Sequence, residues 1–241
     1  MNPSSLEEDP RSHEVVRLSE IFDSLQGEGV NTGQPCRFVR LAICNLHCGY
    51  CDTKYTWDFA HFDYEREVRE IAVEALAAEL EGAPAGHVVI TGGEPLLQQR
   101  ALARVLELAS PRLFIEVETN GTRVPSDALL ARINQWNVSP KLSNAGDPEA
   151  QRIRPDALLA LRDSGRAYLK LVVASSADRD EAEALRERFG FERSRTLLMP
   201  QAVSREELET RSGDVATWSQ ALGVRFSSRL HLALWGGRRG T

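Results

Sequence analysis

The chain has 241 residues, of which 42% are hydrophobic and 27% are charged, and its formal net charge is −6. This length suits one α/β domain, and the lack of a long apolar run argues against a membrane protein. The acidic balance argues against a surface for binding DNA or RNA. Residues 1–14 lack the basic start and apolar core of a secretory signal, so we expect a flexible extension of a cytoplasmic protein. Residues 15–241 are expected to form the single domain.

Short apolar segments alternate with longer helical patterns in that domain. The predicted strands are Val15–Ser24, Arg37–Ile43, His87–Thr91, Leu113–Thr119, Trp136–Ser139, Tyr168–Ala174, Thr196–Pro200 and Leu230–Leu234. Several of them are nearly continuous apolar runs, which is typical of strands covered on both faces. The predicted helices are Glu65–Glu81, Pro95–Ala109, Ser126–Gln135, Pro155–Asp163, Arg179–Phe189 and Arg205–Leu222. Pro95 and Pro155 each start one of these helices, and Gly165 and Gly190 each follow the end of one, as helix boundaries favour.

Repeated strand–helix units predict an α/β fold with a parallel sheet and right-handed crossovers. About six such units are fewer than the eight of a closed barrel, so we expect an incomplete, open parallel β/α barrel. In parallel folds the reactive face lies at the carboxyl ends of the strands. We therefore expect functional residues to follow the predicted strands directly.

A cluster of cysteines follows the second predicted strand. Cys44, Cys48 and Cys51 have the spacing C-x3-C-x2-C. Three thiolates suit a four-iron cluster in which one iron lacks a protein ligand and stays open to a cofactor. A structural zinc site would need a fourth ligand, for which Cys36 and His47 are candidates, and a C-x-x-C redox pair would not need Cys44. Cys36 lies outside the spacing and is expected to be a core or loop residue.

The cysteine spacing, with Tyr50 before the third cysteine, resembles the cluster signature of the radical S-adenosylmethionine (SAM) superfamily. The segment Thr91-Gly-Gly-Glu-Pro95, between a predicted strand and a helix, resembles the superfamily stretch that contacts the SAM amino group. This resemblance implies that SAM chelates the open iron of a 4Fe-4S cluster. An electron from the reduced cluster then splits SAM and yields a 5′-deoxyadenosyl radical, so no side chain is expected to be the catalytic group.

A narrower resemblance covers nearly the whole chain after residue 14. Its motifs are Ile21-Phe-Asp-Ser24-Leu25-Gln26-Gly27-Glu28-Gly29, Gly33, Pro35, Phe38, Arg40, the cysteine segment, Thr91-Gly-Gly-Glu-Pro-Leu96, Glu118-Thr119-Asn120-Gly121, Ser139-Pro140-Lys141 and Leu234-Trp235-Gly236. Together they resemble the 7-carboxy-7-deazaguanine synthase family. The resemblance implies a lyase that converts 6-carboxy-5,6,7,8-tetrahydropterin to 7-carboxy-7-deazaguanine with loss of ammonia, for queuosine and related 7-deazapurines.

The same resemblance implies roles for individual residues. It places the pterin on Leu25, Gln26, Gly27, Glu28, Arg40 and Thr91. It places SAM on Tyr50, Cys51, Asp52, Gly93, Glu118, Ser139, Pro140, Lys141 and Gln201. Thr53 would be a ligand of Mg²⁺, a cation that prefers oxygen ligands and keeps several waters.

Several of these roles have structural alternatives. Residues 25–29 could instead form only a glycine-rich turn that ends a strand, and Arg40 could instead form a structural ion pair. Glu118 and Asn120 are expected either to contact ligands or to support residues that do. Lys170, in an apolar strand, is expected to be paired or to reach the sheet edge. Contact of Lys170 or of the Thr241 carboxylate with a ligand stays open.

The family resemblance also implies partners. These are flavodoxin or ferredoxin as the electron donor and a second copy of the chain in a homodimer, with no nucleic acid and no membrane. A glycyl-radical activating enzyme acting on a protein partner is the alternative activity, since it shares the cysteine spacing. It would not need the segment from Leu25 to Gly29. A zinc-stabilised binding module is the alternative without catalysis.

Overall fold

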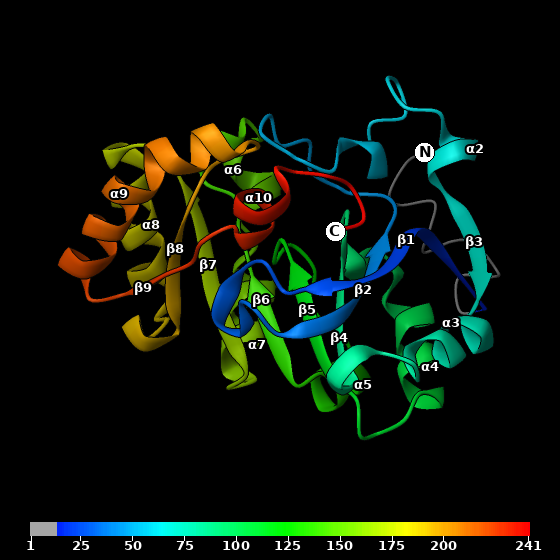
Figure 1. Cartoon of the computed structure of the whole chain (residues 1–241). Coiled ribbons are helices and arrows are strands. Elements are labelled where there is room, and N and C mark those ends of the chain that lie inside the picture. Colours follow the sequence, from blue (N-terminus) through cyan, green and yellow to red (C-terminus); the bar gives the residue numbers. More distant parts are fainter. Residues whose placement is uncertain (1–13) are drawn as a thin grey trace.

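The computed structural model describes residues 14–241, so the predicted extension lies outside the described residues except for Glu14. The described residues form one sheet of nine strands in the spatial order β3-β1-β2-β4-β5-β6-β7-β8-β9 (Figure 1). The strands are β1 (Val15–Leu25), β2 (Pro35–Leu41), β3 (Arg69–Ala72), β4 (His87–Gly92), β5 (Phe114–Thr119), β6 (Gln135–Val138), β7 (Ala167–Val173), β8 (Thr196–Pro200) and β9 (Arg225–Phe226).

All neighbouring strands from β2 through β4 to β9 are parallel. Their apolar sequences are buried nearly from end to end, as in β8, because helices cover the outer face of the sheet. Strands β3 and β9 lie at opposite edges, so the sheet of residues 14–241 does not close. The predicted open, incomplete barrel is confirmed.

The helices are α2 (Tyr64–Glu67), α3 (Val73–Leu80), α4 (Gln99–Leu108), α5 (Asp127–Arg132), α6 (Glu149–Arg152), α7 (Pro155–Asp163), α8 (Ser176–Phe189), α9 (Arg205–Leu222) and α10 (Leu230–Trp235). Helix α8 begins with a capping box between Ser175 and Asp178 and ends at Gly190, whose φ of 67° suits glycine. It packs on β7 while α9 packs on β8. The main core lies between these helices and the sheet, around the fully buried Trp136.

Single-turn 3₁₀ helices occupy several connections. They are η1 (Gly29–Asn31), η2 (Lys54–Thr56), η3 (Pro84–Gly86), η4 (Pro95–Gln98), η5 (Ser143–Ala145) and η6 (Arg193–Arg195). The η4 turn begins at Glu94, whose side chain accepts a hydrogen bond from the Leu96 amide at 3.0 Å. This turn fixes the chain directly after β4, where functional residues are expected.

Two predicted elements were wrong. The expected helix Glu65–Glu81 is divided, because residues 69–72 form β3 and pair antiparallel with β1, for example Ile71 with Val16. The edge of β1 supplies backbone partners that outweigh the local helix preference. Strand β1 is also antiparallel to β2, so the N-terminal part of the sheet departs from the parallel pattern.

The expected strand Leu230–Leu234 is the helix α10 instead. An apolar run of this length fits a strand and a short helix equally well. Only Leu232 is buried in α10, whereas Leu234 is 47% exposed, so the two faces of the segment differ as they do in an amphipathic helix. Gly236, with φ 64°, ends it.

Candidate active site

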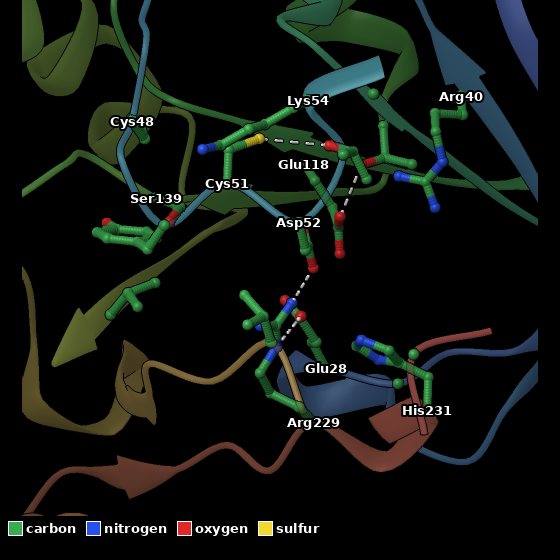
Figure 2. Close-up of a pocket in the computed structure, with 18 of the residues that line it drawn as sticks. Glu28, Arg40, Cys48, Cys51, Asp52, Lys54, Glu118, Ser139, Arg229 and His231 are labelled. Carbon is green, nitrogen blue, oxygen red and sulfur yellow. Dashed lines mark hydrogen bonds and ion pairs between the residues drawn. The ribbon is translucent and has the colours of Figure 1, made fainter. Parts of the chain in front are cut away.

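A cavity of about 660 Å³ lies at the carboxyl ends of the parallel strands. The predicted residues that line it are Leu25, Gln26, Gly27, Glu28, Arg40, Cys44, Cys48, Tyr50, Cys51, Asp52, Thr53, Thr91, Gly93, Glu118, Ser139, Lys141 and Gln201. Asn120, Lys170 and Thr241 line it as well, whereas Pro140 does not. Figure 2 shows side chains from the loop after β1, from the cysteine loop, from β2 and β5, from the residue after β6 and from the start of α10 and the residue before it around one space. The tertiary structure thus brings together nearly all predicted site residues.

The cysteine loop leaves β2 through an unusual backbone conformation at Ile43. Its φ is 75°, which is rare for a β-branched residue. The Ile43 amide donates to the Thr56 carbonyl at 2.7 Å, and its carbonyl accepts from the Glu94 amide at 2.8 Å. These two bonds hold the strained residue and join the start and the end of the loop to the turn after β4.

The glycine pair after β4 lies against this same loop. A Cβ on Gly92 would meet the Leu41 carbonyl oxygen at 2.1 Å, and one on Gly93 would meet that of Ile43 at 2.0 Å. The Gly93 amide also donates to Leu41 at 2.9 Å. The close backbone approach that the glycines permit is therefore an approach to the chain that leads into Cys44.

The three thiols of the motif are free, and they face a common space. Trp57 Nε1 donates to the Cys51 sulfur at 3.3 Å, the Thr53 hydroxyl lies 3.6 Å from the same sulfur, and Asn120 Nδ2 lies 3.9 Å from that of Cys44. Such donors stabilise sulfur ligands of an iron–sulfur cluster.

Among residues 14–241 no three Cys, His, Asp or Glu side chains converge on one point as ligands of a single ion. A four-iron cluster does not need such convergence, because each cysteine binds a separate iron. Burial raises the pKa of the Cys48 thiol to about 11, so metal binding must displace its proton. The donor set of the loop fits the cluster.

The two candidate fourth ligands of a zinc site lie elsewhere. Cys36 is fully buried in β2, where it packs with Phe38 and Val89. The ring of His47 lies 4.9 Å from that of Trp57, and His47 is absent from the cavity lining. Cys36 is thus the core residue that its position outside the motif predicted.

Glu28 occupies the wall of the cavity opposite the cysteine loop, and Lys170 and Arg229 both form ion pairs with it. Burial acts to raise the pKa of Glu28, but these two cations outweigh it and hold that pKa well below its ordinary value. Burial likewise acts to lower the pKa of Lys170, whereas Glu118 and Glu28 raise it. Both groups therefore stay charged at neutral pH, and the alternative of a paired Lys170 is confirmed.

The side chain of Gln26 is 1% exposed and engaged by the protein. Its Nε2 donates to Glu116 at 2.7 Å and lies 3.4 Å from an oxygen of Glu118, while its Oε1 accepts from the Glu28 amide at 3.2 Å. One lone pair of Oε1 is left for a ligand. Gln26 thus holds its loop against β5 as well as lining the cavity.

Arg40 extends from β2, and its guanidinium points into the cavity (Figure 2). Its Nε lies 3.4 Å from Glu20, and its guanidinium carbon lies 5.6 Å from the centre of the Phe22 ring. The buried Nε has no hydrogen-bond partner among the described residues. Arg40 therefore has the structural ion pair considered above and retains donors for an anion in the cavity.

Further polar groups face the cavity from neighbouring strands. The Thr91 hydroxyl donates to Glu118 at 2.8 Å, and Lys141 Nζ donates to Ser139 at 3.1 Å. The buried hydroxyl of Tyr50 has no hydrogen-bond partner within residues 14–241. An unpartnered buried hydroxyl beside the cysteines is a group that a bound cofactor can satisfy.

Comparisons with known proteins agree with this geometry. Residues 39–139 match the radical SAM superfamily. The chain is 43% identical to the 7-carboxy-7-deazaguanine synthase of Pyrobaculum aerophilum, over 93% of this chain and 97% of that one. It is 37% identical to the 7-carboxy-7-deazaguanine synthase of Halobacterium salinarum, over 92% of this chain and 91% of that one. The chain belongs to the 7-carboxy-7-deazaguanine synthase family.

The crystal structure of QueE from Escherichia coli has the same fold, with a TM-score of 0.67 at 25% identity over 96% of this chain and 99% of that one. As a 7-carboxy-7-deazaguanine synthase family member in the radical SAM superfamily, the chain requires a 4Fe-4S cluster, SAM and an electron donor. The comparisons do not favour the glycyl-radical activating enzyme. None of the helices in the described part is long and apolar enough to cross a membrane.

Sequence reasoning missed the contribution that residues near the C-terminus make to this family member's cavity. Arg229 contacts Glu28 and Asp52, and His231 packs so closely on Gly27 that a Cβ there would meet its Nδ1 at 2.4 Å. Burial lowers the pKa of His231, which favours its neutral form. In the sequence, the one signal for this contact is the glycine at position 27, whose missing side chain leaves room for a neighbour. That neighbour, His231, lies about two hundred residues further along the chain.

Proposed function

We propose that the protein converts 6-carboxy-5,6,7,8-tetrahydropterin to 7-carboxy-7-deazaguanine and ammonia, a step toward queuosine. One observation carries the proposal: in a chain of this family, the three cysteines of the motif and a wall of paired polar side chains face a single cavity. Its volume of about 660 Å³ lies within the usual range for small-molecule sites. There is room for both a cofactor and a flat heterocycle.

The polar wall matches the chemistry of the pterin. Its pyrimidinone edge carries N–H donors, and the carboxylate of Glu28 is an acceptor that stays fixed by its ion pairs with Lys170 and Arg229. The Arg40 guanidinium would hold the pterin carboxylate. Buried groups of this kind discriminate strongly, because an analogue that lacks a donor leaves them unpaired.

Cys44, Cys48 and Cys51 would hold the cluster. When bound, the cluster and SAM supply the radical that removes a hydrogen atom from the pterin. The residues proposed for SAM belong to this loop or line the same cavity, apart from Pro140: Tyr50, Cys51, Asp52, Gly93, Glu118, Ser139, Lys141 and Gln201. Their work is to bind the cofactor and to orient it toward the pterin.

Thr53 is proposed as a ligand of Mg²⁺, through which the pterin carboxylate would be positioned. Its hydroxyl lies at the cavity wall beside the sulfur of Cys51. A single protein oxygen suffices, because Mg²⁺ keeps several waters and takes further oxygens from the substrate.

We further propose a cytoplasmic homodimer that receives electrons from flavodoxin or ferredoxin. These points rest on the family resemblance. The net charge of −6 gives no support to a nucleic-acid partner.

Anaerobic reconstitution tests the proposal. The reconstituted, reduced protein with SAM, Mg²⁺ and carboxytetrahydropterin should yield 7-carboxy-7-deazaguanine by mass spectrometry. A protein that takes up iron and cleaves SAM but forms no such product would contradict the substrate assignment. A colourless protein that folds with zinc and takes up no iron would contradict the cluster.

A further inference from the structure

Arg229 joins three separate segments at the cavity wall. It lies between β9 and α10, and its side chain is 9% exposed. Its Nε donates to Glu28 at 3.0 Å, one terminal nitrogen pairs with Asp52, and the other donates to the Ala202 carbonyl. Figure 2 shows the guanidinium between Glu28 and Asp52. One planar group thus contacts the loop after β1, the cysteine loop and the loop after β8.

The ionic contacts continue beyond Glu28. Its second carboxylate oxygen pairs with Lys170, whose Nζ lies 3.8 Å from Glu118, and Glu118 in turn accepts from Thr91. Arg229 therefore connects a chain of contacts on the side of the proposed pterin site to the residue next to the cysteine ligand Cys51.

The charges explain why this position needs a cation. Glu28, Asp52 and Glu118 are three carboxylates, against two cations in Lys170 and Arg229. Glu28 and Asp52 are close enough to repel each other. Without Arg229, Glu28 would keep only Lys170 as an ionic partner, and Asp52, whose side chain is 37% exposed, would lose its ion pair, so no cation would join the two loops.

We propose that Arg229 is a positioning residue that holds the Glu28 loop at a fixed position relative to the Asp52 loop. The radical formed at the cysteine loop then lies within reach of the pterin, so that cleavage of SAM leads to product. This rests on the proposed function. A flat substrate bound by Glu28 must lie within reach of a radical that forms at the cysteine loop, and a misplacement of about 1 Å can reduce turnover about a hundredfold. The forked guanidinium suits the task, because its nitrogens lie at fixed angles, whereas lysine offers a single ammonium.

The test compares Arg229→Met and Arg229→Lys with Arg186→Lys in the reconstituted protein. Arg186 is a matched control, because it is 11% exposed, contacts two carboxylates and a backbone carbonyl, and lies on α8 away from the cavity. Arg229→Met should weaken binding of 7-carboxy-7-deazaguanine, measured by calorimetry, by about 10- to 100-fold. It should also raise the number of SAM molecules cleaved per product about tenfold, at unchanged iron content. Arg229→Lys should give values of both quantities between those of Arg229→Met and the wild type.

Hydrogen exchange in the absence of substrate separates this inference from the proposed function. Arg229→Met should raise exchange at residues 26–29 and 52–54, and Arg186→Lys should not. Three results would overturn the role of Arg229. They are unchanged hydrogen exchange in Arg229→Met, a wild-type number of SAM molecules cleaved per product in Arg229→Met, and wild-type values of both quantities in Arg229→Lys. If iron content and all activities fell in parallel in Arg229→Met, Arg229 would have a structural role only, and the positioning role would be rejected. A wild-type protein without product, but with the exchange difference, would reject the function and leave the link between the loops standing.

Discussion

At the scale of single residues, polar side chains in this cavity have partners before any ligand binds. Gln26, Glu28 and Lys170 make ion pairs or hydrogen bonds within the protein, and they still line the space. Fixed partners keep such groups in place and charged, so that little reorganisation is needed when a ligand arrives. Arg40 and Tyr50 differ, since each has a buried polar atom without a hydrogen-bond partner among residues 14–241.

Thr53 allows a direct test of the proposed magnesium site. Thr53→Ala removes the hydroxyl oxygen and leaves the cysteines in place, so the Mg²⁺ concentration needed for half-maximal product formation should rise at least about tenfold. SAM cleavage should fall far less. Thr53→Ser, which keeps the hydroxyl, is the matched control. If both activities fell equally in Thr53→Ala, the residue would only shape the cysteine loop, as its 3.6 Å contact with the Cys51 sulfur allows.

The buried thiol of Cys36 should make the free energy of unfolding depend on pH in the alkaline range. Burial, followed by the charges of Glu116 and Glu118, raises its pKa to about 12. A thiol in the unfolded chain ionises near pH 8.5, so above that pH the unfolded state loses its proton first and is favoured. Wild-type protein should therefore lose about 2 kcal/mol of unfolding free energy from this group between pH 8 and pH 10. Urea unfolding should show a shallower decline for Cys36→Ala; equal slopes would contradict the buried, protonated thiol.

At the scale of elements, the ends of β2 and β4 build the site together. Their backbones approach so closely that Gly92 and Gly93 have no room for a side chain, and the strained Ile43 is held between them and Thr56. The motif after β4 therefore serves the cysteine loop through packing in addition to any contact with SAM.

Gly93→Ala tests this packing. The added methyl group would collide with the Ile43 carbonyl, which is backbone and cannot swing aside, so we expect a loss of about 3 kcal/mol in unfolding free energy. Iron incorporation should fall as well. Gly213→Ala is the control, because Gly213 lies within α9 with free space around it, and alanine there should stabilise by about 1 kcal/mol. Thermal unfolding with equal effects for both variants would contradict the role of the glycine pair.

Elements also show where local patterns mislead. The strands β4, β7 and β8 match their predicted bounds within one residue, because their nearly continuous apolar runs are buried on both faces of the sheet, as in parallel strands. Strand β3 was missed because its pairing with β1 decides its conformation, and α10 was mistaken because a short apolar run carries no clear period.

At the scale of the whole molecule, the last residues return to the first strand. Residues 237–241 line the cavity, and Arg239 pairs with Glu20 of β1 and with Glu67 of α2 at 2.7 Å. Its guanidinium carbon also lies 3.9 Å from the centre of the Tyr55 ring. Figure 1 shows this segment crossing from α10 toward β1 and β2 above the sheet. The wall of the cavity thus joins parts of the chain that are far apart in sequence.

Arg239→Ala should loosen this part of the wall. The side chain is 45% exposed, so its loss should lower overall stability by less than about 1 kcal/mol. Hydrogen exchange at residues 236–241 should increase, and the KM for the pterin should rise by up to about fivefold. Arg66→Ala, which removes an 83% exposed arginine paired with Asp63, is the control and should change neither quantity. Unaltered exchange of the tail in Arg239→Ala would show that its contacts do not hold the wall.

The sequence by itself determined the open α/β barrel, the cysteine cluster motif and the family, because each rests on patterns that can be read along the chain without knowing which distant segments meet. Apolar runs reveal buried strands, and fixed spacings reveal ligands that one loop presents together. Only the tertiary structure decided which distant polar side chains meet. Arg229 reaches Glu28 and Asp52, His231 fills the space left by Gly27, and Gln26 is engaged by Glu116. The partners in each pair lie at least 90 residues apart, and no local period records which distant side chains the folded sheet brings into contact.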